Sequence, residues 1–192
     1  MITLPALGDN YIYIYTYSPG KALAVDPADA ALVLKTLDEY ELDLTHILVT
    51  HGHYDHTAGI NQIKSDTGCE LIQNHDPERL EIDNTRIDII PTPGHTQDSV
   101  CFYILPSGDK PGILFTGDTL FIGGCGRPMG CEAAVLRHSL QKIASLPDDT
   151  LVYPGHNYTR ENYEFALTIE PEKQALKDEI EKLKELQKEM RP

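Results

Sequence analysis

The sequence predicts an α/β domain in which helices cover the outer faces of β-sheets. Apolar runs of strand length alternate along the chain with segments of helical spacing, and residues 11–17 show the strict two-residue alternation of a strand with one aromatic face. Behind Asp29, a residue suited to cap a helix, Val33, Leu37 and Tyr40 follow at helical spacing. The chain has 192 residues, of which 41% are hydrophobic, so one core is expected.

The other elements are indicated by short apolar runs and by the residues that end them. Asp26-Pro27 stops one strand, and Gly68 ends one helix. A further helix is indicated by Leu136, Leu140 and Ile143, which fall on one face. Strands are expected at 11–17, 23–25, 47–49, 70–73, 86–90, 99–104, 112–116 and 151–153, and helices after Asp29 and at about 58–65, 132–146 and 172–190.

The last of these helices carries a near-heptad seam within a shell of Lys and Glu, formed by Leu176, Ile180, Leu183 and Met190. Packing of this seam on the body of the protein is favoured over pairing with a second copy. We therefore expect residues 1–192 to form a single domain with a C-terminal helix, present as a monomer or a homodimer.

Charge and composition exclude several classes of protein. The formal charge of −14 disfavours nucleic acid, because phosphate binding needs a basic surface, and it disfavours anionic membrane surfaces. No apolar run approaches the ~18 residues of a membrane span, and the first residues lack the basic and apolar regions of a signal peptide. The four cysteines have no disulfide-framework spacing, so a reducing, cytoplasmic location is expected.

The central motif is Thr50–His56, Thr-His-Gly-His-Tyr-Asp-His, which lies between a buried strand and a helix. In an extended segment, side chains two residues apart face the same way, so His51 and His53 are expected to bind one metal ion. Where the chain turns into the helix, Asp55 and His56 are directed toward a second ion. Random placement of three histidines and one aspartate at these offsets is rare.

Three later strand ends each carry one more candidate ligand, namely His95, Asp118 and His156, all preceded by glycine. Ends of strands at one sheet edge are where functional sites assemble. Imidazole and carboxylate ligands suit Zn, Fe, Ni or Mn, and the lack of cysteine among them argues against a purely structural zinc site. We expect two divalent metal ions, zinc first and iron or manganese as alternatives, with Asp118 between them. The other histidines are interpreted as structural: His46, His75 and His138.

With these residues the sequence resembles the metallo-β-lactamase superfamily, whose motif is a His-x-His-x-Asp-His loop followed by isolated His, Asp and His residues. Within the superfamily it is most similar to glyoxalase II, the hydroxyacylglutathione hydrolases. The similarity spans nearly the whole chain, and the matching segments are 7–11, 50–59, 116–121, 124–127 and 155–159 with Asn162, Phe165, Ala166, Glu170 and Pro171.

The resemblance implies a four-layer αββα sandwich with the site at one edge of the two sheets. It assigns one ion to His51, His53 and His95 and the other to Asp55, His56 and His156, with Asp118 and a hydroxide between the ions. Arg127 and Tyr158 are expected to anchor a substrate carboxylate or peptide backbone. The family usually continues into a helical segment that clamps glutathione, whereas this chain stops at Pro192, and Pro128-Met129-Gly130 stands where the family often has an aromatic residue.

The expected activity is hydrolysis of a small-molecule thioester, such as an acylated glutathione, by the metal-bridging hydroxide. Two cations lower the pKa of a shared water toward ~7, so no serine or cysteine nucleophile is needed. The candidate catalytic residues are the carboxylates Asp55 and Asp118, and Asp55 is interpreted as a ligand because ligation leaves it only an acceptor.

The main alternative is a persulfide dioxygenase of the same fold, which uses one iron and molecular oxygen and shares a segment like Gly124–Arg127. The segment Gly155–Thr159 favours the hydrolase. True β-lactamases typically differ at the position of His56. A nuclease is disfavoured by the acidic composition, and a non-catalytic binding module by the complete set of candidate ligands.

Overall fold

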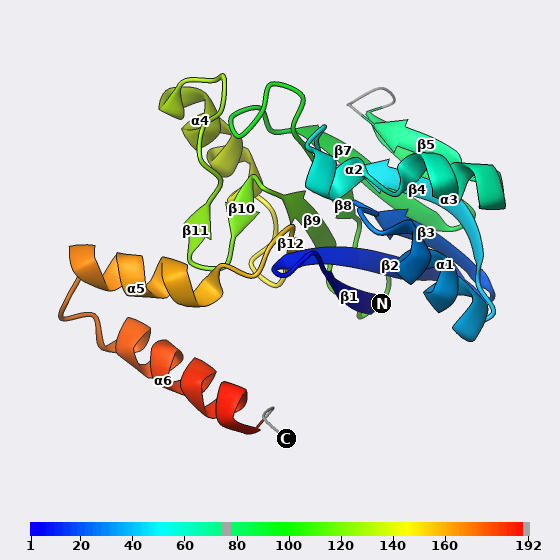
Figure 1. Cartoon of the computed structure of the whole chain (residues 1–192). Helices are drawn as coiled ribbons and strands as arrows, with labels where there is room; N and C mark the ends of the chain where they lie inside the picture. Colours follow the sequence, from blue (N-terminus) through cyan, green and yellow to red (C-terminus); the bar gives the residue numbers. More distant parts are fainter. Residues whose placement is uncertain (74–77, 190–192) are drawn as a thin grey trace.

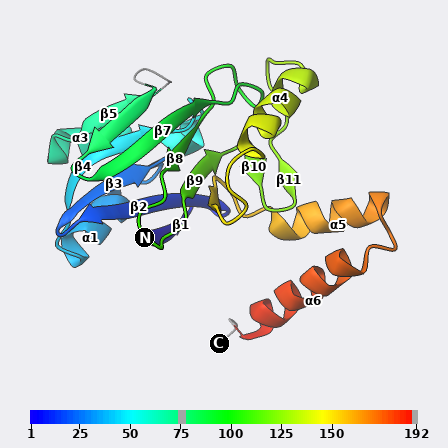
Figure 2. The ribbon, with the colours of Figure 1, turned by 180° about the vertical axis from the view of Figure 1, so that it is seen from behind.

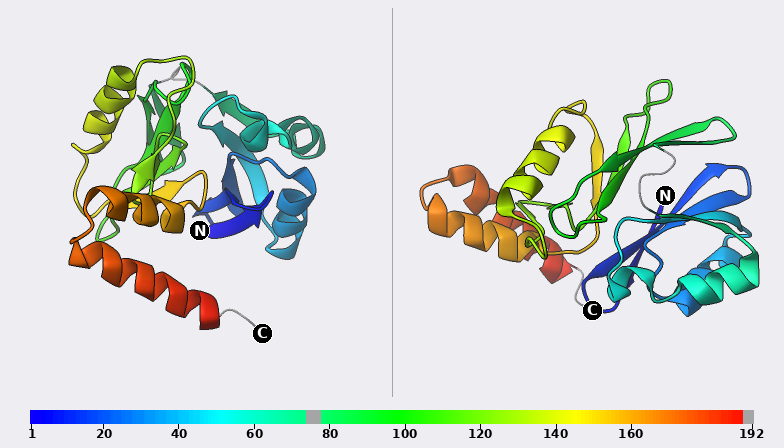
Figure 3. Two further views of the ribbon diagram at one scale, coloured as in Figure 1. Left: turned by 60° about the vertical axis from the view of Figure 1, so that its left-hand side comes forward. Right: turned by 90° about the horizontal axis from the view of Figure 1, so that it is seen from above.

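The structure is a computed structural model and describes residues 1–73 and 78–189. It contains two five-stranded sheets packed face to face with helices outside them (Figure 1). The four-layer αββα sandwich expected from the sequence is confirmed. In Figure 3 the layers are seen in order, from α4 across both sheets to α1 and α3.

The first sheet has the strand order β1-β2-β3-β4-β5. Strands β1, β2 and β3 pair antiparallel, whereas β3, β4 and β5 pair parallel. The strands are β1 (Ile2–Ala6), β2 (Asn10–Ser18), β3 (Lys21–Val25), β4 (Asp43–Val49) and β5 (Glu70–Gln73). Two helices on its outer face, α1 (Ala30–Glu39) and α3 (Ile60–Thr67), follow β3 and β4 and form the crossovers that parallel strands require.

The second sheet has the order β12-β9-β8-β7-β6. Its strands are β6 (Arg79–Ile82), β7 (Thr85–Pro91), β8 (Val100–Ile104), β9 (Ile113–Gly117) and β12 (Leu151–Pro154). Only the β12–β9 pair is parallel, and α4 (Ala133–Ile143) supplies the crossover between these two strands and covers the outer face. A short hairpin of β10 (Leu120–Phe121) and β11 (Gly124–Cys125) projects between α4 and the C-terminal helices.

Both faces of the central strands are buried, which explains why these strands read as nearly continuous apolar runs in the sequence. In β2, Ile12 and Ile14 pack toward α1 and α3, while Tyr13 faces the second sheet. In β8, Phe102 faces the first sheet and Cys101 packs toward α4. Three hydrophobic clusters therefore separate the four layers, and they hold the strand ends at fixed positions along one edge of the sandwich.

Several boundaries differ from the sequence expectations. The helix expected at about 58–65 is α3, which covers Ile60–Thr67, and a short helix that was not expected, α2 (Tyr54–Thr57), precedes it. Gly59 lies between the two helices and packs so closely on Pro27 and Ala30 that no side chain fits there. The helix expected at 132–146 covers only Ala133–Ile143. The expectation that Tyr40 lies on the apolar face of the first helix is wrong, because Tyr40 is the C-cap residue and is 59% exposed.

Several elements were not expected at all, among them β1, β6, α5 (Thr159–Ile169) and the short hairpin of β10 and β11. Strands β1 and β6 are edge strands, the first containing Pro5 and the second charged at alternate positions, so neither shows the apolar pattern of a central strand. The helix α5 has no fully buried side chain, so its apolar pattern is weaker than that of a core helix.

The C-terminal helix α6 (Gln174–Glu189) packs against α5, and the two form a helical hairpin that extends away from the sheets (Figure 2). Of the expected seam, Ile180 is buried, Leu176 and Leu183 are half-buried, and Met190 lies outside the described residues. Within the part of the chain that the structure describes, no helix combines the length and the apolar character needed to cross a membrane.

Candidate metal centre

The candidate site is built at the ends of four strands that meet at one edge of the sandwich. The Thr50–His56 segment leaves β4, His95 lies in the loop between β7 and β8, Asp118 follows β9, and His156 follows β12. Gly117 directly before Asp118 has φ +47°, and a Cβ there would collide with the side chain of Thr50, so only glycine lets the two strand ends approach.

All the side chains expected to bind metal lie in one cluster. His51, His56, His95, Asp118 and His156 are buried, and His53 and Asp55 are half-buried. Their donor atoms form three overlapping groups in which all atoms lie within 4.8 Å of one another: His51, His53 and His95; His51, His56 and Asp118; and Asp55, His56 and His156.

The first donor set is formed by three histidines. The Nδ1 of His53 lies 3.0 Å from the Nε2 of His51 and 3.1 Å from the Nε2 of His95. Two of these rings come from one extended segment and the third from the β7–β8 loop, so the set joins the two sheets.

The second donor set combines two histidines with Asp55. The Nε2 atoms of His56 and His156 lie 3.3 Å apart, and Asp55 Oδ2 lies 3.7 Å and 3.4 Å from them, respectively. His56 is on α2 and His156 follows β12, so this set also draws on both halves of the chain.

Asp118 lies between the two sets. Its Oδ2 is 3.5 Å from His95 Nε2, and its Oδ1 is 3.4 Å from the Nε2 atoms of both His56 and His156. Among the described residues Oδ1 has no hydrogen-bond partner although it is buried. A buried carboxylate oxygen without a partner is costly unless a cation is bound beside it.

The neighbours of the histidines fix which ring nitrogen is free. Carboxylates and carbonyls only accept hydrogen bonds, so His56 Nδ1 donates to Asp26 (3.0 Å) and His95 Nδ1 donates to the carbonyl of Arg127 (2.9 Å). Thr50 gives its own proton to Asp26 and therefore accepts from His51 Nδ1 at 3.1 Å. In each of these rings the lone pair on Nε2 is left facing the cluster.

Lone pairs that face each other at 3.0–3.3 Å repel unless a cation or a proton lies between them. Zinc–nitrogen bonds of 2.0–2.1 Å in a tetrahedron place ligand atoms about 3.3 Å apart. The spacing of the donors thus fits a divalent transition-metal ion in each set, with Asp118 in reach of both.

The electrostatics of the cluster differ between the sets. Burial, aided by His56, lowers the pKa of His51 to about 4. Burial opposes protonation of His156 as well, but Asp118 and Asp9 outweigh it and raise the pKa to about 9. Burial disfavours the charged form of Asp118, yet His156 and His56 keep its pKa below the usual value. Without metal, protons therefore occupy the second set first.

Two glycines leave room for the cluster. A Cβ on Gly155 would lie 2.6 Å from Asp118 Oδ1 and 2.8 Å from His56 Cε1. A Cβ on Gly126 would collide with the carbonyl oxygen of Asp118 and lie 3.0 Å from His95 Nδ1. These positions tolerate no side chain without displacing a donor.

A cavity of about 350 Å³ opens beside the cluster. Arg127 and Tyr158, the residues expected to anchor substrate, both line it, as do Phe121, Cys125, Met129 and Asn162. The Tyr158 ring stacks on His156 with centroids 4.8 Å apart and planes 6° apart. The wall of the cavity therefore contains the cationic side chain of Arg127, several apolar side chains and the part of the cluster that includes Asp118.

Sequence reasoning missed the residues that hold the ligands from behind. Asp26 binds Thr50 and His56, Asp9 Oδ1 accepts from His156 Nδ1 at 2.9 Å, and Asn10 donates to Asp55 Oδ2 at 3.2 Å. Asp26 was interpreted only as the end of a strand. These contacts join residues 24 to 147 positions apart, so no local spacing reveals them.

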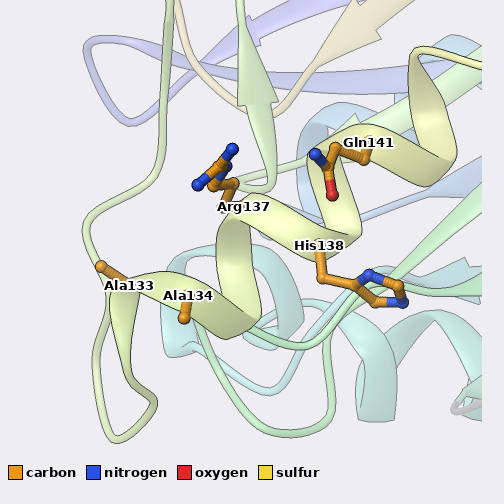
Figure 4. A pocket seen from close by; sticks show the side chains of 5 residues that line it. All are labelled: Ala133, Ala134, Arg137, His138 and Gln141. Atoms are coloured by element: carbon orange, nitrogen blue, oxygen red, sulfur yellow. The ribbon is translucent and has the colours of Figure 1, made fainter.

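The histidines interpreted as structural do not join the cluster where the structure describes them. His46 contacts Thr45 within β4. His138 is exposed on α4 and projects beside Gln141 at an open hollow, also lined by Arg137 (Figure 4). His75 lies outside the described residues.

The model of the metallo-beta-lactamase superfamily matches the chain over residues 10–89 and 75–156. Among solved structures, BLEG-1, a B3 metallo-beta-lactamase, has a TM-score of 0.72 at 23% identity over 80% of this chain and 89% of that one, a likeness of fold alone. ETHE1 from Myxococcus xanthus has a TM-score of 0.68 at 28% identity over 82% of this chain and 76% of that one. TTHA1623 in a di-iron-bound form has a TM-score of 0.68 at 25% identity over 81% of this chain and 91% of that one.

Curated relatives are more similar in sequence. The hydroxyacylglutathione hydrolase of Marinomonas sp. is 41% identical over 88% of this chain and 69% of the relative, and that of Chromohalobacter salexigens is 39% identical over 91% and 72%. The chain therefore belongs to the metallo-beta-lactamase superfamily and, within it, to the family of the hydroxyacylglutathione hydrolases. Membership implies divalent metal ions, for which the histidine–aspartate cluster is the candidate site.

Proposed function

We propose that the chain is a binuclear metal-dependent hydrolase that cleaves the thioester of a hydroxyacyl-glutathione. The observation that carries the proposal is the pair of donor sets that share Asp118, at spacings that suit two cations. The relatives named hydroxyacylglutathione hydrolase support the reaction and the substrate class.

In the proposed centre, one ion is held by His51, His53 and His95 and the other by Asp55, His56 and His156, with Asp118 between them. Zinc is the first candidate, because imidazole and carboxylate ligands suit it, and iron or manganese accept the same ligands. When bound, such ions act as Lewis acids and bring the pKa of water toward ~7.

The residues of the chain then have distinct tasks. Asp118 and Asp55, the candidate catalytic carboxylates, are charged acceptors at the cavity and orient the reacting water. Burial raises the pKa of Asp118, but the neighbouring histidines outweigh this effect and hold the pKa below its usual value, so Asp118 stays ionised. The leaving thiolate corresponds to a thiol with a pKa near ~8.5, so the chain needs no dedicated acid to protonate it.

Arg127 and Tyr158 are proposed to position the substrate in the cavity. Arg127 is exposed and lines the cavity, and a guanidinium suits a carboxylate of the glutathione moiety. The ring of Tyr158 stacks on His156 and meets the ring of Phe121 edge to face, with centroids 5.2 Å apart. These two contacts fix the Tyr158 ring beside the reacting centre. The chain is proposed to act as a monomer or a homodimer.

A mononuclear iron dioxygenase is the alternative within this fold. One ion would leave one donor set without a cation, although in the second set the Nε2 atoms of His56 and His156 lie 3.3 Å apart beside two carboxylates. A complete second set favours the binuclear hydrolase.

The test is metal analysis of the purified protein together with two assays, hydrolysis of lactoylglutathione and oxygen consumption with glutathione persulfide. Two ions per chain and hydrolysis without oxygen uptake are expected. Chelator-treated protein is the control and should recover hydrolysis when metal is restored. A single iron with oxygen uptake would replace the proposal with the dioxygenase.

A further inference from the structure

The turn between β1 and β2 reaches the cluster from the N-terminal end of the chain. Leu7 (φ 51°) and Gly8 (φ 102°) reverse the chain, and the next two residues, Asp9 and Asn10, contact ligands of the second donor set. No residue of this turn contacts His51, His53 or His95 in the hydrogen bonds and ion pairs of the described residues.

Asp9 holds His156. Its Oδ1 lies 2.9 Å from His156 Nδ1, and as a carboxylate oxygen it accepts that proton and leaves Nε2 free toward Asp118 and His56. The Asp9 side chain remains 51% exposed while that of His156 is only 5% exposed, so the carboxylate stays hydrated on the side away from the ring. This contact fixes both the tautomer and the direction of the histidine.

Asn10 holds Asp55. Its Nδ2 donates to the backbone oxygen of Asp55 at 3.0 Å and to Oδ2 at 3.2 Å, the oxygen that faces His156. Asn10 is 4% exposed, so the amide is locked in place and its two donor hydrogens have defined partners.

Backbone bonds tie the turn to the segment that carries His156. Asn157 donates to the carbonyl of Asp9 and Tyr11 donates to the carbonyl of Gly155, each at 2.9 Å, and Asn10 pairs with His156 in an isolated antiparallel bridge. The turn and the strand end therefore form one rigid unit around the ligand.

We propose that the β1–β2 turn is a positioning element for the second metal ion alone, in which Asp9 orients His156 and Asn10 orients Asp55. The inference rests on the proposed binuclear centre. Partners of this kind typically change metal affinity 10- to 100-fold, so removal of Asp9 should weaken one of the two bound ions and spare the other.

The experiment titrates metal-free protein with Zn²⁺ in competition with a chromogenic chelator and resolves two affinities. Asp9→Ala should weaken one of the two equivalents by about 10- to 100-fold and leave the other unchanged. Asp9→Asn retains an oxygen that accepts the Nδ1 proton and should recover most of the loss. Asn10→Asp has the same shape but turns an acceptor toward Asp55, so it should weaken the same equivalent.

Asp109→Ala is the matched control, because Asp109 is an exposed aspartate in the β8–β9 loop, which lies at the opposite end of these strands from His95 and Asp118. It should bind both ions as the parent protein does. Thermal unfolding of each metal-free variant checks that the fold is kept.

The possible outcomes are distinct. If the parent protein binds two ions and Asp9→Ala and Asn10→Asp retain both affinities, the positioning role is wrong while the binuclear centre stands. Equal loss of both equivalents in these variants also contradicts a role confined to one ion. If the parent protein binds fewer than two ions, the proposed function itself fails.

Discussion

Adding one methyl group at Gly155 should disable the centre without replacing any ligand. In Gly155→Ala the new Cβ would lie 2.6 Å from Asp118 Oδ1 and 2.8 Å from His56 Cε1, whereas ordinary contacts begin at 3.4 Å. Asp118 must therefore retreat by about 0.8 Å, and metal ligands tolerate only about 0.2 Å. Gly155 lies between β12 and the His156 segment, whose backbone bonds prevent it from moving away instead.

We expect kcat for lactoylglutathione to fall by about 100-fold, the size of effect that a 1 Å misplacement produces. Metal analysis should show loss of at least one ion per chain. Gly20→Ala is the control: Gly20 has φ +71° and nothing within 4 Å of a Cβ, so it costs about 1 kcal/mol of stability but leaves the centre intact. Parent-like turnover and metal content in Gly155→Ala would refute the packing and the ligand role of Asp118.

Asp118→Ala should abolish turnover and reduce metal content below two ions, measured by elemental analysis, because both donor sets lose the carboxylate that they share; retained hydrolysis would contradict the bridging role. Arg127→Ala should raise KM for lactoylglutathione more than it lowers kcat, since its backbone carbonyl still accepts from His95; an unchanged KM would remove Arg127 from the substrate site. Metal binding at pH 7 should release protons, measured by calorimetry in buffers of different ionisation enthalpy. His156 has its metal-free pKa raised to about 9, mainly by Asp118 against the effect of burial, so affinity for the second ion should increase with pH up to that value.

The sequence predicted the layered fold and the convergence of the cluster residues because both depend on local patterns. The alternation of Ile12, Tyr13 and Ile14 shows two buried faces, and histidine or aspartate directly behind a strand and a glycine marks a shared sheet edge. Such patterns are set within a few residues, so they are visible without a structure.

The parts that could not be predicted depend on distant contacts or on exposed surfaces. Asp9 meets His156 from 147 positions away, and nothing around it in the sequence indicates that partner. The helix α5 exposes Phe165 and Ile169, at 66% and 67%, so its apolar residues form no buried stripe. Edge strands such as β6 are charged because one side of the strand has no partner.

The most direct test of the binuclear centre is anomalous diffraction from crystals of the metal-loaded protein, recorded at the absorption edge of the metal found by elemental analysis. We expect two peaks about 3.5–4 Å apart, each beside one donor set, with Asp118 in contact with both. A single peak, or two peaks away from His51 and His156, would contradict the shared-carboxylate centre on which the proposed hydrolysis depends.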